Sequence, residues 1–330
     1  MCSTLAIVAA CSIPLLMGSG LGCASAARKK QEAIYGPSES VIEVVALLRR
    51  HVPDDTYRFP PAVDFTGRNV YRASLLRLES LERVHADALR AGHLDGVIAF
   101  AKGRALERLR AYDLAAEHYR KAETYRGSLP DAALRGARFC EALHAAGQLG
   151  IDLVDPISER PEEGRLSDAA VEVVEALDER VAQLSALAEQ VEEGESAHYE
   201  AIIREEIERA DLVRARYFAA LRHVLPDGHV RAVAEAQRVV ARHPASKDAL
   251  RHLLALANLY GELAGEYVEA NPPEGLRFDP PRFQELVDAA SRLYQRVASQ
   301  DGTPVKLEAA RRLEAFLAFT LQVDRDRFTR

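Results

Sequence analysis

Disulfide bonds cannot hold this 330-residue chain together, because it has almost no cysteine beyond its first residues. Three of the four cysteines, Cys2, Cys11 and Cys23, lie within the first 27 residues, and only Cys140 remains in the rest. A single thiol cannot close an intramolecular bond, so a disulfide framework is excluded. Cys140 lies in an apolar helical context, which predicts a buried structural cysteine rather than a nucleophile.

The short motifs of common catalytic and metal sites are also missing. The sequence has no H-E-x-x-H, H-x-x-x-H or C-x-x-C pattern, no glycine-rich phosphate loop and no G-x-S-x-G. We expect its scattered histidines to be solvated or to cap helices (His198, His223, His229, His243 and His252). Acidic runs such as Glu205–Glu208 alternate with arginine, which predicts solvated helix faces. We therefore expect no catalytic residue, no cofactor and no metal.

Basic patches and tryptophan are missing as well. The formal net charge is −7, and no basic stripe stands out along the chain. A nucleic-acid-binding protein usually displays one, so we expect no nucleic-acid partner. Alanine, leucine, arginine and glutamate are abundant, and no run of alternating apolar residues is long enough to demand a strand. The composition therefore predicts an all-α protein.

Charged side chains are absent from Met1–Ala27. An apolar core is followed by small residues, which is typical of a secretory signal, and we predict a leader over residues 1–26. Ala24-Ser25-Ala26 is an A-x-A site at which ordinary signal peptidase would cleave after Ala26 and release a soluble periplasmic or secreted protein. Since Arg28-Lys29-Lys30 follows the apolar core and no basic residue precedes it, an uncleaved membrane segment is a further alternative.

The leader also resembles that of bacterial lipoproteins. Gly20-Leu21-Gly22-Cys23 is similar to the end of a lipobox, whose cysteine receives a diacylglyceryl group and becomes the new N-terminus. The resemblance implies lipidation of Cys23, with palmitate-type acyl chains, and a protein anchored in the membrane on the periplasmic side of a bacterial cell envelope.

The segment 27–67 predicts a short helix followed by a proline-containing loop. Ser40 and Glu43 form a capping-box pattern that would start the helix. The loop carries three aromatic residues, Tyr57, Phe59 and Phe65. Aromatic side chains in such a loop can anchor a partner protein. The alternative is that they fold back onto the first helices and close the end of the structure.

Residues 68–150 predict helical hairpins, and the pattern over 95–147 resembles a tetratricopeptide repeat. That family packs two helices through small residues and an aromatic side chain. Its packing positions fall here on four residues: Gly103, Ala115, Tyr119 and Ala122. Apart from any family, the two alanines would let neighbouring helices approach closely, and Tyr119 would fill the remaining space.

The rest of the chain predicts more helix pairs. Residues 151–165 contain proline and glycine and predict a linker loop. Residues 166–225 predict a long helical hairpin with a coiled-coil-like apolar seam. Residues 226–330 predict C-terminal helical repeats, with a weaker tetratricopeptide-like pattern over 212–262 and a helix start at Asp279-Pro280.

These expectations combine into an all-α, right-handed array of antiparallel helical hairpins that follows an N-terminal signal segment. Such arrays present extended surfaces that bind proteins or peptides. The expected function is a non-catalytic, lipid-anchored scaffold or adaptor that binds protein or peptide partners in the cell envelope. Two alternatives stay open: an exported enzyme with its active site in a groove between helices, and a structural spacer without a defined partner.

Overall fold

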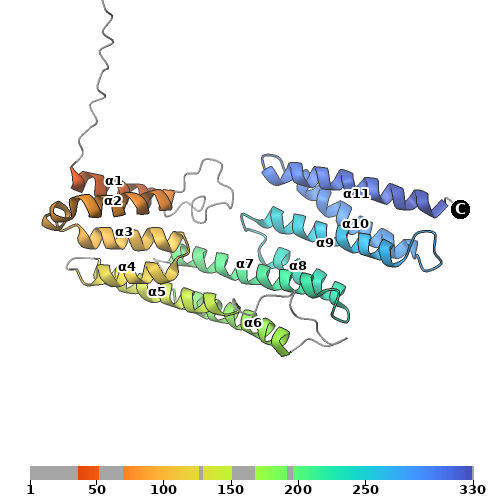
Figure 1. Cartoon of the computed structure of the whole chain (residues 1–330), viewed down its shortest axis with the longest axis horizontal. Helices are drawn as coiled ribbons and strands as arrows, with labels where there is room; N and C mark the ends of the chain where they lie inside the picture. The colour runs from red at the N-terminus through yellow and green to blue at the C-terminus, as the bar shows by residue number, and fades with distance from the viewer. Residues whose placement is uncertain (1–35, 52–69, 126–128, 151–167, 192–195, 329–330) are drawn as a thin grey trace, which may run out of the picture. The chain divides into compact units, whose positions relative to one another are not determined.

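The computed structural model describes residues 36–51, 70–125, 129–150, 168–191 and 196–328. Every regular element in these ranges is an α-helix, and no strand occurs among them (Figure 1). The helices are α1 (Pro37–His51), α2 (Val70–Ala91), α3 (Asp95–Arg108), α4 (Tyr112–Glu123), α5 (Pro130–Gln148), α6 (Asp168–Glu189), α7 (Ser196–Leu221), α8 (Gly228–Arg242), α9 (Ala249–Ala270), α10 (Pro280–Ala298) and α11 (Pro304–Phe328). The predicted all-α class is confirmed for the described residues.

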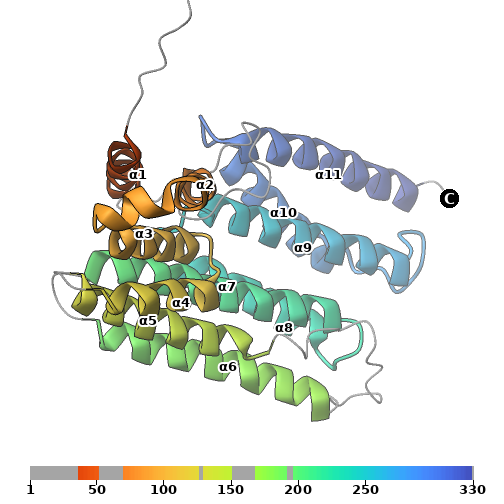
Figure 2. The same cartoon turned by 60° about the vertical axis from the view of Figure 1, so that its left-hand side comes forward.

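The helices pack in the order in which they follow along the chain. Each helix from α1 to α10 contacts the next one, and these contacts lie within one unit, Pro37–Arg330. Contacts between next-but-one helices also occur, as between α1 and α3, α3 and α5, and α9 and α11. Figure 2 shows the successive helices α3 to α6 lying side by side. Packing between sequence neighbours is consistent with a helical repeat array.

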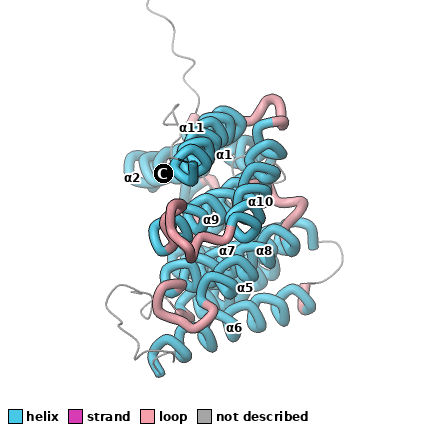
Figure 3. Tube along the Cα trace, turned by 90° about the vertical axis from the view of Figure 1, so that its right-hand side faces the viewer, coloured by secondary structure: helices cyan, strands magenta, loops and turns pink. Residues whose placement is uncertain are grey.

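The apolar core is divided into clusters that follow one another along the array. One cluster joins α1, α2 and α3, and the largest extends from α3 to α7. A further cluster joins α6 and α7 around Leu177 and Phe218, and another joins α9, α10 and α11 around Phe283 and Phe316. Figure 3 shows the described helices packed against one another, joined by loops and turns. Because each cluster is shared by neighbouring helices, no described helix depends on a single central core.

Tyr119 fills the space where α3, α4 and α5 cross. Its side chain is fully buried on α4, and its ring lies against Gly103 of α3 and Gly136 of α5. A Cβ atom on Gly103 would lie 2.7 Å from Cδ1 of Tyr119, and one on Gly136 would lie 3.0 Å from Cε2. Ala115 and Ala122 of α4 are also fully buried. The four residues that carried the repeat resemblance therefore lie at one helix crossing.

The two helix starts predicted from the sequence, at Ser40 and at Asp279-Pro280, differ in outcome. Residue Pro37, not Ser40, begins α1, because proline suits the first helical turn, where no backbone N–H is needed. The predicted capping box at Ser40 is wrong, since Ser40 lies inside the helix. Asp279 does precede α10, but its side chain makes no capping hydrogen bond, and Pro280 occupies the first turn. None of the described helices combines the length and the apolar character needed to cross a membrane.

The turn between α7 and α8 requires glycine. Asp227 adopts φ of +55°, and a Cβ atom on Gly228 would lie 2.3 Å from the carbonyl oxygen of Arg222. A side chain at residue 228 would therefore push α8 away from the end of α7. This close approach sets the positions of the residues on both sides of the turn, including His223 and His229.

The contact between Tyr119 and Gly103 predicts opposite effects of two glycine-to-alanine substitutions. We expect Gly103→Ala to lower the free energy of unfolding by about 1–3 kcal/mol, because the new methyl group overlaps the buried ring. A methyl group added at Gly265 on α9 would meet no neighbouring helix or side chain within 4 Å, so Gly265→Ala should raise the free energy by up to about 1 kcal/mol. Urea unfolding followed by circular dichroism measures both. Equal effects of the two substitutions would contradict the close packing of Tyr119.

Candidate functional site

Helix α7 carries three acidic side chains that bind partners from other helices. Glu206 and Asp211 are buried, and Glu208 is half-buried. The expectation that this acidic run forms a solvated face is therefore wrong. Buried carboxylates need compensating charges or hydrogen-bond donors, and each of the three has them.

Glu206 joins α7 to the α3–α4 turn and to α6. Nε and Nη2 of Arg110 donate to its two oxygens over 2.6 and 2.8 Å, and the Tyr112 hydroxyl donates to Oε1 over 2.8 Å. Arg180 of α6 lies 3.5 Å from Oε2. Burial raises the pKa of the Tyr112 hydroxyl, and the neighbouring Glu206 carboxylate raises it further, so this tyrosine remains a hydrogen-bond donor.

Asp211 and Glu208 join α7 to α8 and α9. Nη1 of Arg242 lies 3.0 Å from Oδ2 of Asp211, and Nε2 of His243 lies 2.9 Å from the same oxygen. Nε2 of His252 lies 2.6 Å from Oε1 of Glu208. The side chains of His243 and His252 are only 6% and 4% exposed. Neither histidine is solvated: His243 caps the C-terminus of α8, as one of the two expected roles has it, whereas His252 lies buried inside α9, so the expectation is wrong for His252.

Glu107 is the most deeply buried carboxylate of α3, and His198 of α7 binds it. The Glu107 side chain is fully buried, and it accepts a hydrogen bond of 2.8 Å from the Tyr119 hydroxyl. Burial alone would raise the pKa of Glu107, but His198 and the guanidinium groups of Arg104 and Arg108 hold that pKa well below its usual range.

His198 itself is held in its neutral form. Burial lowers the pKa of His198, and the two arginines lower it further, although Glu107 opposes them. Its ring nitrogens contact Glu107, Arg104 and Arg108. A neutral ring can accept at Nδ1 from Arg108 and donate from Nε2 to Glu107; Nη1 of Arg104, which lies against the same Nε2, then donates to Oε1 of Glu107 and not to the ring. These contacts join α3 to the first turn of α7.

Cys140 lies next to this cluster and is buried, as predicted. Its Sγ atom lies 3.9 Å from Oε2 of Glu107. Burial raises the pKa of the thiol, and the Glu107 carboxylate raises it further, so the nucleophilic thiolate form is suppressed.

A groove on the C-terminal part of the array is the best candidate for binding. It has a volume of about 490 Å³ and is lined by α8, α9, the start of the following loop and α10. Its apolar lining consists of Val230, Val233, Ala234, Tyr260, Leu263, Tyr267, Ala270 and Leu286. Polar and charged side chains complete it: His229, Gln237, Glu266, Asn271, Arg282 and Glu285. The volume lies in the range of small-ligand and peptide side-chain pockets.

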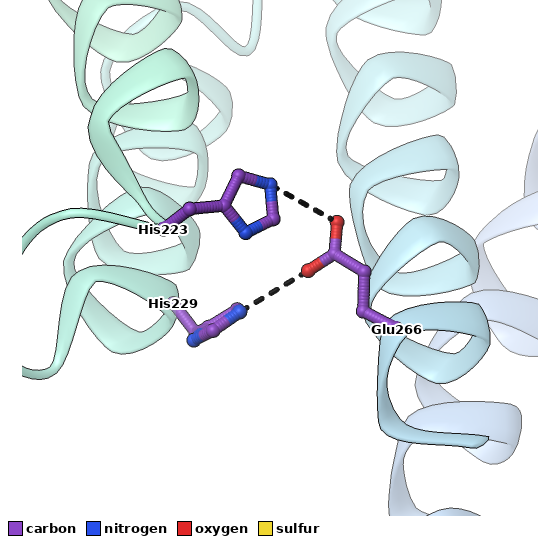
Figure 4. A group of neighbouring side chains, drawn as sticks. All are labelled: His223, His229 and Glu266. Atoms are coloured by element: carbon purple, nitrogen blue, oxygen red, sulfur yellow. Dashed lines mark hydrogen bonds and ion pairs between the residues drawn. The ribbon is translucent and has the colours of Figure 1, made fainter. Parts of the chain in front are cut away.

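Two histidines and a glutamate meet at the edge of this groove. His223 follows α7, His229 lies in the first turn of α8, and Glu266 lies on α9 (Figure 4). Nε2 of His229 is 3.1 Å from Oε2 of Glu266, and Nε2 of His223 is 3.5 Å from Oε1. Burial alone would raise the pKa of Glu266, but Arg222 and the two histidines lower it. The carboxylate is therefore ionised at neutral pH.

Some of the residues predicted from the sequence to bind a lipid or a partner lie outside the part of the chain that the structure describes. Cys23 and the aromatic residues Tyr57, Phe59 and Phe65 lie outside the described residues. Gly103, Ala115, Tyr119 and Ala122 lie at a packed crossing, where they shape the fold rather than a surface.

No protein-family model matches the chain, and no curated protein is significantly similar to it. The function is therefore inferred from the groove, the charges and the ligand cluster themselves.

The sequence did not predict the meeting of His223, His229 and Glu266. The two histidines are six residues apart and flank the Pro226-Asp227-Gly228 turn, which is a usable signal that the ends of two helices meet there. Glu266 is 37 residues from His229, and its position depends on the packing of α9 against α8. The groove also depends on that packing.

The buried ion pairs of α7 predict a strong effect of removing one charge. We expect Asp211→Asn to lower the free energy of unfolding by about 3 kcal/mol, because Arg238 and Arg242 lose their counter-charge and the buried His243 loses its contact with a carboxylate oxygen. Arg238 and Arg242 are partly exposed and can turn to solvent when the carboxylate is removed. The expected loss of stability therefore lies at the lower end of the range for a buried ion pair that loses one partner. Chemical unfolding at pH 7 measures the change.

Asp301→Asn is the matched control for this experiment. Its side chain is 89% exposed and pairs only with Lys306 among the described residues. Ion pairs in solvent contribute little to stability, so we expect no measurable change. An effect of Asp211→Asn as small as that of the control would show that the α7 charges do not join the helices.

Proposed function

We propose that this protein is a scaffold of the bacterial cell envelope that binds segments of other proteins along its helical array. The observation that carries the proposal is the groove between α8, α9 and α10. It is lined by three consecutive helices, and its lining combines apolar side chains with charged ones. This combination suits side chains of a partner segment that are buried at one end and solvated at the other.

The charges around the groove favour a particular kind of segment. Glu285 of α10 is exposed at the groove and has no hydrogen bond or ion pair with the other described residues. Val230 is 68% exposed although it lines the same groove. A segment with one or two aliphatic or aromatic side chains followed by lysine or arginine would cover Val230 and pair with Glu285. The chain's net charge of −7 also favours a basic partner.

The groove is a binding surface rather than an active site in this proposal. The buried titratable residues of the array, such as Glu107, Glu206 and Asp211, are engaged by neighbouring helices and do not line the groove. The packing of Tyr119 against Gly103 and Gly136 supports a tetratricopeptide-like repeat in the N-terminal half. Repeats of that kind serve as protein-binding frameworks.

Selection of peptides on the full chain tests the groove and its charge preference. We expect random peptides that bind the wild type to share an apolar side chain followed by a basic one. Val230→Asp should weaken their binding about tenfold or more, which corresponds to about 1.4 kcal/mol. Glu285→Arg should reverse the preference toward acidic peptides. Fluorescence anisotropy with labelled peptides gives the affinities.

The control is Glu314→Arg, which makes the same charge change on the exposed surface of α11, away from the groove. We expect it to leave peptide affinity and charge preference unchanged. If the selected peptides bind all three variants as they bind the wild type, the groove is not their site and the proposal fails.

The envelope location in this proposal rests on the lipobox-like Gly22-Cys23 and the uncharged leader. We expect the protein extracted from host membranes to begin at Cys23 and to carry a lipid-sized mass increment, which Cys23→Ala should abolish. Intact mass spectrometry measures both. An N-terminus at Ala27 without added mass would instead identify a free secreted protein, and a retained leader would contradict processing.

A further inference from the structure

The cluster of His223, His229 and Glu266 has a geometry that the binding of a protein segment does not explain. Its three residues come from three places in the chain: the turn after α7, the first turn of α8 and the second half of α9. One potential donor atom from each side chain lies within 4.8 Å of the other two. Figure 4 shows both imidazole rings directed toward the two oxygens of the Glu266 carboxylate.

We propose that this cluster is a binding site for a divalent transition-metal ion, with Zn²⁺ as the best fit. Two imidazole nitrogens and one carboxylate oxygen form a donor set that zinc binds in proteins. Tetrahedral zinc with bonds of about 2.1 Å needs donors about 3.4 Å apart. Nε2 of His229 lies 3.1 Å from Oε2 of Glu266, and Nε2 of His223 lies 3.5 Å from Oε1, so each histidine is near that separation from a different oxygen of the carboxylate.

The side chains can make the remaining adjustment. The His223 and His229 side chains are 55% and 52% exposed, so both rings can turn without disturbing the core. Their ring centroids are 5.8 Å apart and the rings are nearly perpendicular. Turning of the two rings moves their nitrogens to the distances that a common ion requires, while the backbone stays fixed by the Gly228 turn.

Arg222 positions the carboxylate instead of blocking it. Its Nη2 lies 2.7 Å from Oε1 of Glu266 and 3.0 Å from Oε2 of Glu262, and its Nη1 donates to the carbonyl oxygen of Ala219. Oε1 is therefore held from the end of α7, and Oε2 is directed toward His229. Carboxylates that bind a metal ion commonly also accept a hydrogen bond from a neighbouring residue, which orients them. Glu262 and Glu266 bring two formal negative charges to the one positive charge of Arg222, which favours a cation at this place.

The site would leave one coordination position for a further donor. Three protein ligands occupy three corners of a tetrahedron, and the fourth is filled by water or by a group from a bound molecule. His229 and Glu266 also line the groove, so the open position lies at the groove's edge. The metal proposal does not depend on protein binding there, because its ligands are all supplied by this chain.

Titration of the full chain with Zn²⁺ alone tests the proposal. We expect isothermal titration calorimetry to show one ion bound per chain. His223→Gln and His229→Gln should each weaken the binding by more than about tenfold, since even the loss of a group that only supports a metal ligand costs about 10- to 100-fold. X-ray absorption at the zinc edge should show nitrogen and oxygen neighbours only. His85→Gln, which changes an exposed histidine on α2, should have no effect on affinity.

Two results would overturn the assignment. One is the absence of Zn²⁺ binding at millimolar concentration. The other is binding that both His223→Gln and His229→Gln leave unchanged, which would place the ion elsewhere. Val230→Asp separates the two proposals, because it should weaken peptide binding in the groove while one zinc ion is still bound per chain. All variants alter exposed side chains, so circular dichroism should show the wild-type helix content.

Discussion

The polar contacts of α7 are the constraint on which the described array depends. Through Glu206, α7 binds the α3–α4 turn and α6, and through Asp211 and Glu208 it binds α8 and α9. His198, near its start, binds Glu107 on α3. Apolar packing alone would let α7 slide or rotate against its neighbours, whereas paired charges fix one register because any other leaves a buried charge without a partner.

The same helix positions the candidate site. Arg222 follows the end of α7 and binds Glu262 and Glu266 on α9, and Gly228 brings the start of α8 against the Arg222 carbonyl group. This arrangement places His223 and His229 on the same carboxylate. The groove beyond them is shaped by the apolar faces of α8, α9 and α10. The site is thus a consequence of how α7, α8 and α9 are joined, and its residues need no long loop to bring them together.

The sequence predicted the helical class and the small residues Gly103, Ala115 and Ala122 beside Tyr119, because these follow from local propensity and from spacing along one helix. It did not predict which charges are buried. Glu206 and Asp211 lie in a sequence rich in glutamate and arginine, which is also typical of solvent-exposed helix faces. Only their contacts with residues of other helices and turns show that these two side chains are buried. The candidate site was missed for the same reason, since Glu266 meets His223 and His229 only after α9 packs beside α8.

The central claim is that the groove between α8, α9 and α10 holds a segment of another protein. Photo-crosslinking in membranes of the host tests it most directly, with a photoreactive amino acid at Val230 in the groove and, for comparison, at Leu276, which is 98% exposed in the loop before α10. The account predicts a discrete protein adduct from residue 230 whose crosslinked peptide has an apolar residue followed by a basic one, and no such adduct from residue 276. Absence of an adduct at residue 230, or the same adduct from both positions, would contradict it.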